Sequence, residues 1–269
     1  MNKLFCYQEF FIFNEKGRGL DVELRVGTPI PELKLKNKIA IFMLGPPASG
    51  KSTFVKKVIL PINDNFKQIN SDDISMIVQK WKEEGGKKDF ITTFNPARQS
   101  TTKTHAYILQ MIKSGNNFIY DTTGQSFDTV NEFSNIARNN NYKCIFIHVL
   151  VDLKTAIERN SIRLKKNTQP PVDIDYIKVS HKGVVSLIKK YIENIDWEKD
   201  SYYVVTTKDF ELNFYKIIKN NILFYWDRTY INTNMTIADF YKKLNEGLRK
   251  FYGYDILLEN LGITKDDHL

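Results

Sequence analysis

The sequence predicts an α/β fold built on a mostly parallel, doubly wound sheet with helices on both faces. Two features of the chain support this prediction. From residue 39 onward, short continuous apolar runs alternate with amphipathic segments, which is the pattern of buried parallel strands joined by helices. A turn rich in glycine and proline, at 45–50, directly follows the first apolar run, in the strand–turn–helix order of a phosphate-binding loop.

Each predicted element follows from the spacing of its apolar residues. Short apolar runs predict strands at 39–44, 66–70, 117–121, 143–150 and 202–206. Amphipathic stretches predict helices at 51–60, 72–83, 97–114, 126–139, 152–166 and about 175–191. Ser126 and Asp152 stand where helix N-caps are expected.

Two extensions flank this main domain, which we place at 38–208. Residues 1–37 alternate apolar and polar positions around a turn-prone stretch at 14–19, which predicts an N-terminal β-hairpin. Residues 209–269 are aromatic and amphipathic, which predicts a C-terminal helical extension packed on the domain.

The composition is that of a folded globular protein and favours a polyanionic partner. Hydrophobic residues make up 42% of the 269 residues, which excludes wholesale disorder. No apolar run is long enough to cross a membrane, and the polar residues near the N-terminus do not fit a signal peptide, so we expect a cytoplasmic protein with no membrane partner. Cys6 and Cys144 are expected to behave as buried hydrophobes, and the histidines show no metal-ligand spacing. The net charge of +8 suits a polyanion.

The glycine-rich turn carries the clearest chemistry. Its spacing, Gly45-x-x-x-x-Gly50-Lys51-Ser52, is that of a loop whose backbone N–H groups cradle the phosphates of a nucleotide. We expect Lys51 to reach the β- and γ-phosphates and Ser52 to coordinate Mg²⁺. The predicted nucleotide-binding residues are therefore Gly45, Pro46, Pro47, Ala48, Ser49, Gly50, Lys51, Ser52 and Thr53.

Carboxylates follow two further predicted strands. Asp72 and Asp73 come just after the strand at 66–70, and Asp121 ends the strand at 117–121. Because the carboxyl ends of parallel strands line one crevice, these acids are expected on the same rim as the glycine-rich turn. A carboxylate there can accept the proton of an attacking hydroxyl or hold a Mg²⁺-bound water or the acceptor. The alternatives are a helix cap at 72–73 and a structural turn at 121.

A basic helix is expected beside this crevice. Arg159 and Arg163 are four residues apart, so they share one face of the predicted helix, and Lys165 and Lys166 add positive charge. Such a face, in a lid at about 152–180, can close over a triphosphate and stabilise the charge that develops during phosphoryl transfer. The alternative is an ordinary solvated face.

These stretches together resemble the P-loop kinases that include phage-type polynucleotide kinase and the zeta toxins. The resemblance covers roughly 38–205 and rests on the segments 45–53, 69–74, 119–124 and 158–177. It implies a three-layer P-loop NTPase-type domain that uses ATP and Mg²⁺. It further implies that Asp72 is the general base, that Arg163 contacts the transferring phosphoryl group with Arg159 beside it, and that Asp121 helps to place the acceptor. We also expect Asp73, next to the base, to contact the substrate.

One departure bears on the acceptor. The polynucleotide kinases have an arginine three residues after the base, where this chain has Ser75; Arg98 is a candidate substitute, or a plain surface arginine. The leading expectation is a kinase of a polynucleotide 5′-hydroxyl, favoured by the net charge and the basic lid. The alternatives are a zeta-toxin-like kinase of a nucleotide sugar or another small metabolite, and a non-catalytic nucleotide-binding protein that acts through its two extensions.

Overall fold

The architecture is known from a computed structural model of the chain. The structure describes residues 29–35, 38–70, 97–166, 172–208, 211–219, 221–226 and 229–250. The predicted hairpin up to residue 28, the helix predicted at 72–83, and Asp72 and Asp73 lie outside the described residues.

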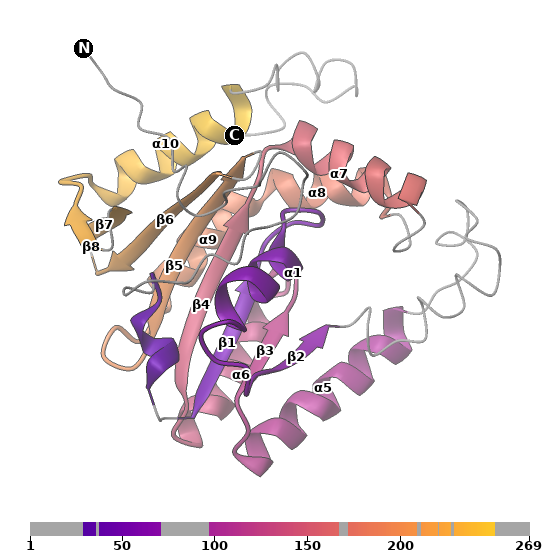
Figure 1. The fold of residues 1–269 in the computed structure, drawn as a ribbon, viewed down its shortest axis with the longest axis vertical. Coiled ribbons are helices and arrows are strands. Elements are labelled where there is room, and N and C mark those ends of the chain that lie inside the picture. The colour runs from indigo at the N-terminus through magenta and orange to yellow at the C-terminus, as the bar shows by residue number, and fades with distance from the viewer. Residues whose placement is uncertain are drawn as a thin grey trace.

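A single eight-stranded sheet runs through the part of the chain that the structure describes, in the order β2-β3-β1-β4-β5-β6-β7-β8 (Figure 1). The strands β2, β3, β1, β4 and β5 pair in parallel, and β5 to β8 pair in antiparallel fashion. Their bounds are β1 Ile39–Leu44, β2 Lys67–Asn70, β3 Phe118–Asp121, β4 Lys143–Leu150, β5 Ser201–Lys208, β6 Glu211–Ile218, β7 Asn221–Trp226 and β8 Thr229–Asn232.

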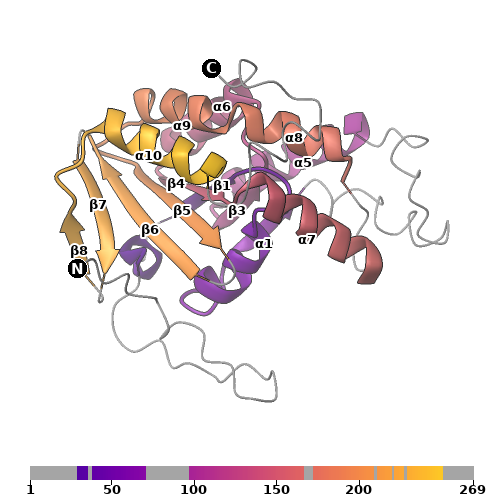
Figure 2. The same ribbon diagram turned by 90° about the horizontal axis from the view of Figure 1, so that it is seen from above.

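Helices cover both faces of the sheet, as Figure 2 shows from above. Each of the six residues of β1 is buried, and alternate side chains enter two separate cores because strand residues alternate between faces. One core packs against α5 (Ala97–Ser114), α6 (Phe127–Asn139), α9 (Val184–Glu193) and α10 (Ile237–Lys250). The other packs against α1 (Lys51–Phe54), its π-helical continuation η2 (Val55–Ile59) and the 3-10 helix η1 (Pro31–Lys34).

Most of the sequence-based elements agree with the structure. The five predicted strands are confirmed to within two residues at each end, and so are the helices predicted at 97–114, 126–139 and 152–166, the last of which is α7 (Leu153–Lys166). The helix predicted at about 175–191 is instead two helices, α8 (Ile174–Lys182) and α9, which meet at Gly183. Gly183 has φ −95° and ψ 0°, outside the helical region, and glycine adopts such a conformation readily.

The helical prediction for 209–269 is wrong over the strands β6 to β8 and correct for α10. In β6, Phe214 and Ile217 enter opposite cores, because this part of the sheet is also covered on both faces. Apolar residues on both faces of a strand give a spacing that also fits a helix, whereas the aromatic and β-branched content favours the strand. The turn after β6 contains Lys219 at φ 54°, which reverses the chain.

A buried polar cluster ties the segment 29–35 to the sheet. The Glu32 carboxylate accepts hydrogen bonds from Ser201 Oγ (2.7 Å), Tyr203 Oη (2.6 Å) and Lys216 Nζ (2.9 Å). Burial acts to raise the pKa of Glu32, but these hydrogen bonds and the charge of Lys216 outweigh it and lower the pKa. Glu32 therefore stays ionised and joins η1 to β5 and β6.

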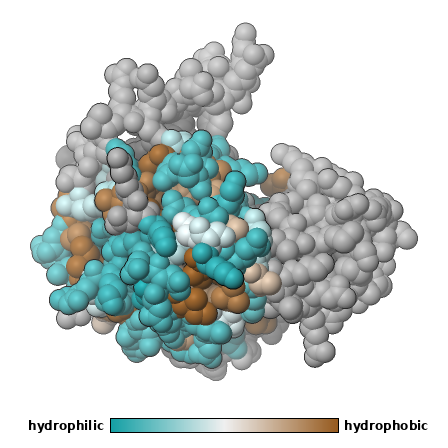
Figure 3. Space-filling model, turned by 90° about the horizontal axis from the view of Figure 1, so that it is seen from below, coloured by the Kyte–Doolittle hydropathy of each residue, from teal (hydrophilic) through white to brown (hydrophobic). Residues whose placement is uncertain are grey.

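Seen from below, at the amino ends of the parallel strands, the coloured surface is mainly hydrophilic with small apolar patches (Figure 3). Such scattered apolar residues are normal on a solvated surface. No helix in the described ranges has the length and hydropathy needed to span a bilayer.

Candidate active site

The glycine-rich turn follows β1 and adopts a backbone that opens toward an anion. Gly45 has φ 141°, Ala48 has φ 60° and Gly50 has φ 103°. A Cβ atom on Gly45 would lie 2.2 Å from the carbonyl oxygen of Val149, so only glycine fits there. Left-handed residues interspersed in a short loop turn successive N–H groups toward a common point, which makes a concave anion-binding site.

Lys51 lies across this loop. Its ammonium nitrogen donates hydrogen bonds to the carbonyl oxygens of Gly45 (2.8 Å) and Pro46 (3.2 Å), and it lies 3.9 Å from Asp121 Oδ1. The Lys51 side chain is 12% exposed. The positive charge is therefore held at the mouth of the loop, where the sequence predicts phosphate contacts.

Asp121 ends β3 and lies beside Ser52. In the sheet register Asp121 pairs with Met43 of β1, two residues before Gly45, and this brings its carboxylate next to the loop. Asp121 Oδ2 accepts a hydrogen bond from Ser52 Oγ at 3.4 Å. The structure thus unites the predicted metal-binding hydroxyl with a buried carboxylate.

Two carboxamides that the sequence analysis missed also contact Asp121. Gln68 Nε2 and Asn70 Nδ2 donate to Asp121 Oδ2 at 3.3 and 3.4 Å. Both residues belong to β2, and since they are two positions apart they share one face, while Ile69 between them enters the core on the other face. The alternation around Ile69 could have shown that Gln68 and Asn70 share the face opposite the α5 core, but not that β3 and Asp121 lie beside them.

Arg159 contacts the loop from the lid helix. Its Nη1 lies 3.4 Å from the carbonyl oxygen of Ala48, 3.2 Å from that of Ser49 and 3.3 Å from Thr207 Oγ1. In this structure the guanidinium binds the loop backbone rather than the site where phosphates are expected. Thr207, near the end of β5, also lies within hydrogen-bond distance of Ser49 O (3.0 Å) and Leu150 O (3.2 Å). No sequence motif marks Thr207.

The segment predicted as a lid contains α7 and α8, and Asn160 joins them. Its side chain donates to Val172 O (2.8 Å) and accepts from Val172 N (3.0 Å), which fixes the start of the α8 segment against α7. In Figure 1, α7 lies at the upper edge of the sheet, where the parallel strands end. Arg163 lies in α7, one turn after Arg159, and Arg98 lies in the first turn of α5; the side chains of both lie outside the described residues.

The predicted site residues therefore fall into two groups. The structure brings together the loop residues 45–50, Lys51, Ser52, Asp121 and Arg159. Thr53 is exposed in α1. The roles expected for Asp72, Asp73, Arg98 and Arg163 stay predictions.

Several buried polar atoms at this end of the molecule have no hydrogen-bond partner. Among the described residues they are Ser49 Oγ, His148 Nε2, Ser180 Oγ and His181 Nε2. His148 is fully buried at the carboxyl half of β4, and its Nδ1 lies 2.6 Å from Tyr202 Oη. Burial, reinforced by the charge of Lys51, lowers the pKa of His148 to about 3, so this imidazole is neutral.

The donor set around the loop fits Mg²⁺. Magnesium binds oxygen ligands, keeps several waters and takes only one or two groups from the protein when a nucleotide supplies the rest. The Ser52 hydroxyl and the Asp121 carboxylate, 3.4 Å apart, are such groups. No cluster of three or more His, Cys, Asp or Glu side chains able to hold a metal occurs within the described ranges.

Comparisons with solved structures support this fold. The chain is similar to a structure from the PezAT toxin–antitoxin system of Streptococcus pneumoniae, with 14% identity, a TM-score of 0.52 and 84% of each chain covered. It is also similar to AvrRxo1-ORF1:AvrRxo1-ORF2 with sulphate ions, with 14% identity, a TM-score of 0.56, and 88% of this chain and 76% of that chain covered. A further match is AvrRxo1-ORF1:-ORF2 with ATP, with 14% identity, a TM-score of 0.55, and 80% and 66% covered.

Sequence comparison identifies the family. No curated protein matches the chain. The AAA_33 family, described as an AAA domain, matches residues 41–179, just over half of the 269-residue chain. This match spans the glycine-rich loop, Asp121 and the lid helix, which are the parts that the structure brings together. The chain therefore belongs to the AAA_33 family and carries its kinase-like P-loop domain.

Proposed function

We propose that the protein is an ATP- and Mg²⁺-dependent kinase that transfers the γ-phosphoryl group to a hydroxyl, with a polynucleotide 5′-hydroxyl as the leading acceptor. The observation that carries this proposal is the meeting of Lys51, Ser52 and Asp121 at the mouth of the loop. An ammonium, a hydroxyl and a carboxylate at a phosphate-binding loop are the parts that phosphoryl transfer from a nucleotide requires.

The residues at the loop act by binding and orienting the donor. Lys51 exchanges its hydrogen bonds to the Gly45 and Pro46 carbonyls for phosphate oxygens and neutralises charge on the group that is transferred. Ser52 and Asp121, whose side chains lie 3.4 Å apart, would hold Mg²⁺ beside the loop. When bound, Mg²⁺ supplies charge stabilisation on the β- and γ-phosphates.

The remaining roles are expectations from the sequence: those of Asp72 and Arg163 follow from the resemblance, and Asp73 and Arg98 are further candidates. Asp72 accepts the proton of the acceptor hydroxyl as its oxygen bonds to the γ-phosphorus. The bond between that phosphorus and the β–γ bridging oxygen breaks, and ADP leaves with the electron pair. Arg163, one turn beyond Arg159 on α7, stabilises the transferring phosphoryl group from the lid, and Asp73 and Arg98 contact the acceptor.

Charge supports a nucleic-acid acceptor. Helix α7 carries a single acidic residue, Glu158, against five basic residues, Lys154, Arg159, Arg163, Lys165 and Lys166. A basic helix beside the crevice favours a polyanionic strand over a neutral metabolite. The fold similarity to the PezAT structure supports a second candidate, a zeta-toxin-like kinase of a nucleotide sugar or another small metabolite.

The test is phosphoryl transfer from labelled ATP to 5′-hydroxyl oligonucleotides, nucleosides and nucleotide sugars. We expect labelling of the oligonucleotide, no transfer by Asp72→Asn, and nearly unchanged ATP affinity in that variant, because the base is needed for chemistry and hardly for binding. Full activity of Asp72→Asn contradicts the assigned base. Labelling of a nucleotide sugar alone, or acceptor affinity that is insensitive to salt, favours the second candidate.

A further inference from the structure

A clamp of two side chains lies against the outer side of the phosphate-binding loop. It consists of Arg159, from the lid helix α7, and Thr207, from the end of β5. Both contact the carbonyl oxygen of Ser49, at 3.2 and 3.0 Å, and they lie 3.3 Å from each other. A Cβ atom on Gly50 would lie 3.5 Å from Arg159 Nη1 and 4.0 Å from Thr207 Oγ1, so the clamp lies directly beside the loop backbone.

The clamp determines which way two peptide groups face. In a trans peptide the carbonyl of one residue and the N–H of the next point in opposite directions, and the described residues contain no cis peptide. Because the Ser49 carbonyl is directed at Arg159 and Thr207, the N–H of Gly50 points the other way, into the loop. The Ala48 carbonyl is held on the same side by Arg159, and the N–H of Ser49 donates to Pro46 O at 3.3 Å.

The loop conformation at 48–50 needs hydrogen-bond donors from other parts of the chain. Ala48 has φ 60° and Gly50 has φ 103°, and a residue other than glycine at positive φ costs about 1 kcal/mol or more. A carbonyl that points outward cannot accept hydrogen bonds from the N–H groups of its own loop, so its oxygen needs a donor from another element. Arg159 and Thr207 are donors in the right place to supply one.

Thr207 reaches the loop because of the alternation of β5. Tyr203 and Val205 face the core that contains α1, and Thr207 continues that face, whereas Val204 and Thr206 belong to the opposite face. Thr207 also lies 3.2 Å from Leu150 O at the end of β4. The hydroxyl therefore connects the ends of two strands to the loop.

We propose that Arg159 and Thr207 are positioning residues that pre-form the phosphate-binding loop by holding the Ala48 and Ser49 carbonyls outward. A loop whose Gly50 N–H already points inward binds an anion without first being ordered, which strengthens binding. Arg159 thereby acts on the donor through the loop backbone, and Arg163 is left to contact the phosphoryl group. The effect on nucleotide binding rests on the proposed function; the effect on the loop itself does not.

The test compares three variants of β5 in the full-length chain. Thr207→Val removes the hydroxyl and keeps the side-chain shape, Thr206→Val makes the same change on the opposite face, and Thr207→Ser restores the hydroxyl. Hydrogen–deuterium exchange of peptides spanning 45–54, without nucleotide, is expected to be several-fold faster in Thr207→Val and unchanged in the other two. A global loss of stability is separated from this local effect by exchange in β1 and β4, which is expected to stay as in the wild type.

Nucleotide binding gives the second readout. We expect the Kd for ADP, measured by titration calorimetry in the presence of Mg²⁺, to rise about fivefold in Thr207→Val. A change of about this size is expected when one hydrogen bond is lost. Equal exchange in the two valine variants overturns the proposal. If the wild type binds no nucleotide, the proposed function fails, while the exchange measurement still decides whether the clamp holds the loop.

Discussion

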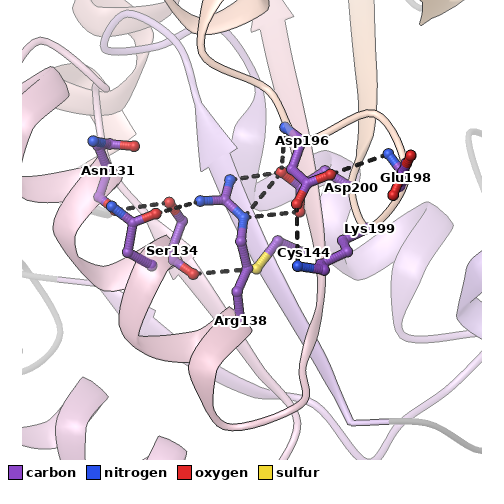
Figure 4. Close-up of polar contacts among 9 residues, drawn as sticks. Asn131, Ser134, Arg138, Cys144, Asp196, Glu198, Lys199 and Asp200 are labelled. Carbon is purple, nitrogen blue, oxygen red and sulfur yellow. Dashed lines mark hydrogen bonds and ion pairs between the residues drawn. The ribbon is translucent and has the colours of Figure 1, made fainter.

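Two buried aspartates at opposite ends of the sheet show how differently this protein uses a carboxylate. Asp200 stands just before β5, at the amino end of the parallel strands. It accepts three contacts from the Arg138 guanidinium, at 2.6, 3.1 and 3.1 Å, and one from the N–H of Asp196 at 3.1 Å (Figure 4). Asp121 stands at the carboxyl end, where its contacts with Ser52, Gln68 and Asn70 are 3.3 to 3.4 Å and Lys51 is 3.9 Å away.

The difference separates a structural site from a candidate functional one. Short charge-assisted hydrogen bonds fix Asp200, and although burial acts to lower the pKa of Arg138, Asp200 raises it on balance. The contacts described for Asp121 are longer and come mostly from neutral donors, and under the proposed function they would be exchanged for contacts to a nucleotide and a metal ion. Nearby, Cys144 donates to Ser134 O at 3.7 Å, and burial raises the pKa of its thiol to about 12, so it is an inert part of the structural end, as the sequence predicts.

The largest expected effect is on stability at the amino end. The Asp200 side chain is fully buried and that of Arg138 is 11% exposed, so Asp200→Asn leaves a guanidinium without its counter-charge. We expect the free energy of unfolding to fall by about 3 kcal/mol, in line with broken buried ion pairs, as measured by urea denaturation. Turnover per folded molecule is expected to stay the same.

A double variant checks that this loss comes from the unpaired charge. Arg138→Met with Asp200→Leu removes both charges, and we expect it to be more stable than Asp200→Asn. If Asp200→Asn is as stable as the wild type, Asp200 does not have the structural role that we contrast with Asp121.

The next effect is on catalysis at the carboxyl end. Asp121→Asn removes the charge that faces Lys51 and Ser52, and we expect turnover with ATP to fall by about 10²- to 10³-fold, as for the loss of one electrostatic contact to the transition state. Stability is expected to change little. The measurement is kcat as a function of Mg²⁺ concentration, with the requirement for Mg²⁺ rising in the variant.

Asp128→Asn is the matched control for this change. Asp128 is also a carboxylate near the carboxyl end, but its side chain is 94% exposed and its partner, Lys190, is 3.7 Å away on the surface. Its replacement is expected to leave turnover unchanged. Equal turnover in Asp121→Asn and the wild type contradicts a role for Asp121 in holding the metal or the donor.

The sequence predicted the five parallel strands and part of the candidate site. Strands such as β1 are buried on both faces and are followed by a glycine-rich turn, so local pattern and spacing specify them. Lys51 and Ser52 are placed by the loop motif itself. The strands β6 to β8 were missed because a strand covered on both faces carries apolar residues at spacings that also fit a helix.

The missed residues owe their roles to sheet register and not to local sequence. Gln68 and Asn70 contact Asp121 because β2 lies beside β3, with Asn70 opposite Asp121. Thr207 contacts Ser49 because β5 lies beside β4, whose last residues flank the loop. Such neighbours are 50 to 160 positions apart in the chain, so only the strand order could have revealed them. Alternation within a strand predicts which residues share a face, but not which strand lies next to it.

The smallest expected effect is a pH dependence of stability that arises from His148 at the carboxyl end. His148, at the carboxyl end, has its pKa lowered to about 3, whereas an unfolded chain binds this proton at a pKa near 6.5. The unfolded state therefore takes up a proton below about pH 6.5 that the native state does not, and stability is lost as the pH falls at about 1.4 kcal/mol per pH unit. Between pH 7 and pH 5 we expect His148 to account for about 2 kcal/mol of the loss.

The variant His148→Gln tests this assignment through urea denaturation at pH 7 and pH 5. Glutamine does not titrate, so the loss of stability between the two pH values is expected to be about 2 kcal/mol smaller than in the wild type. His105→Gln is the control, because His105 is only partly buried and its pKa is lowered by burial but raised again in part by Glu132. An undiminished loss in His148→Gln means that the acid sensitivity does not arise from the buried His148 imidazole, whose Nε2 has no hydrogen-bond partner.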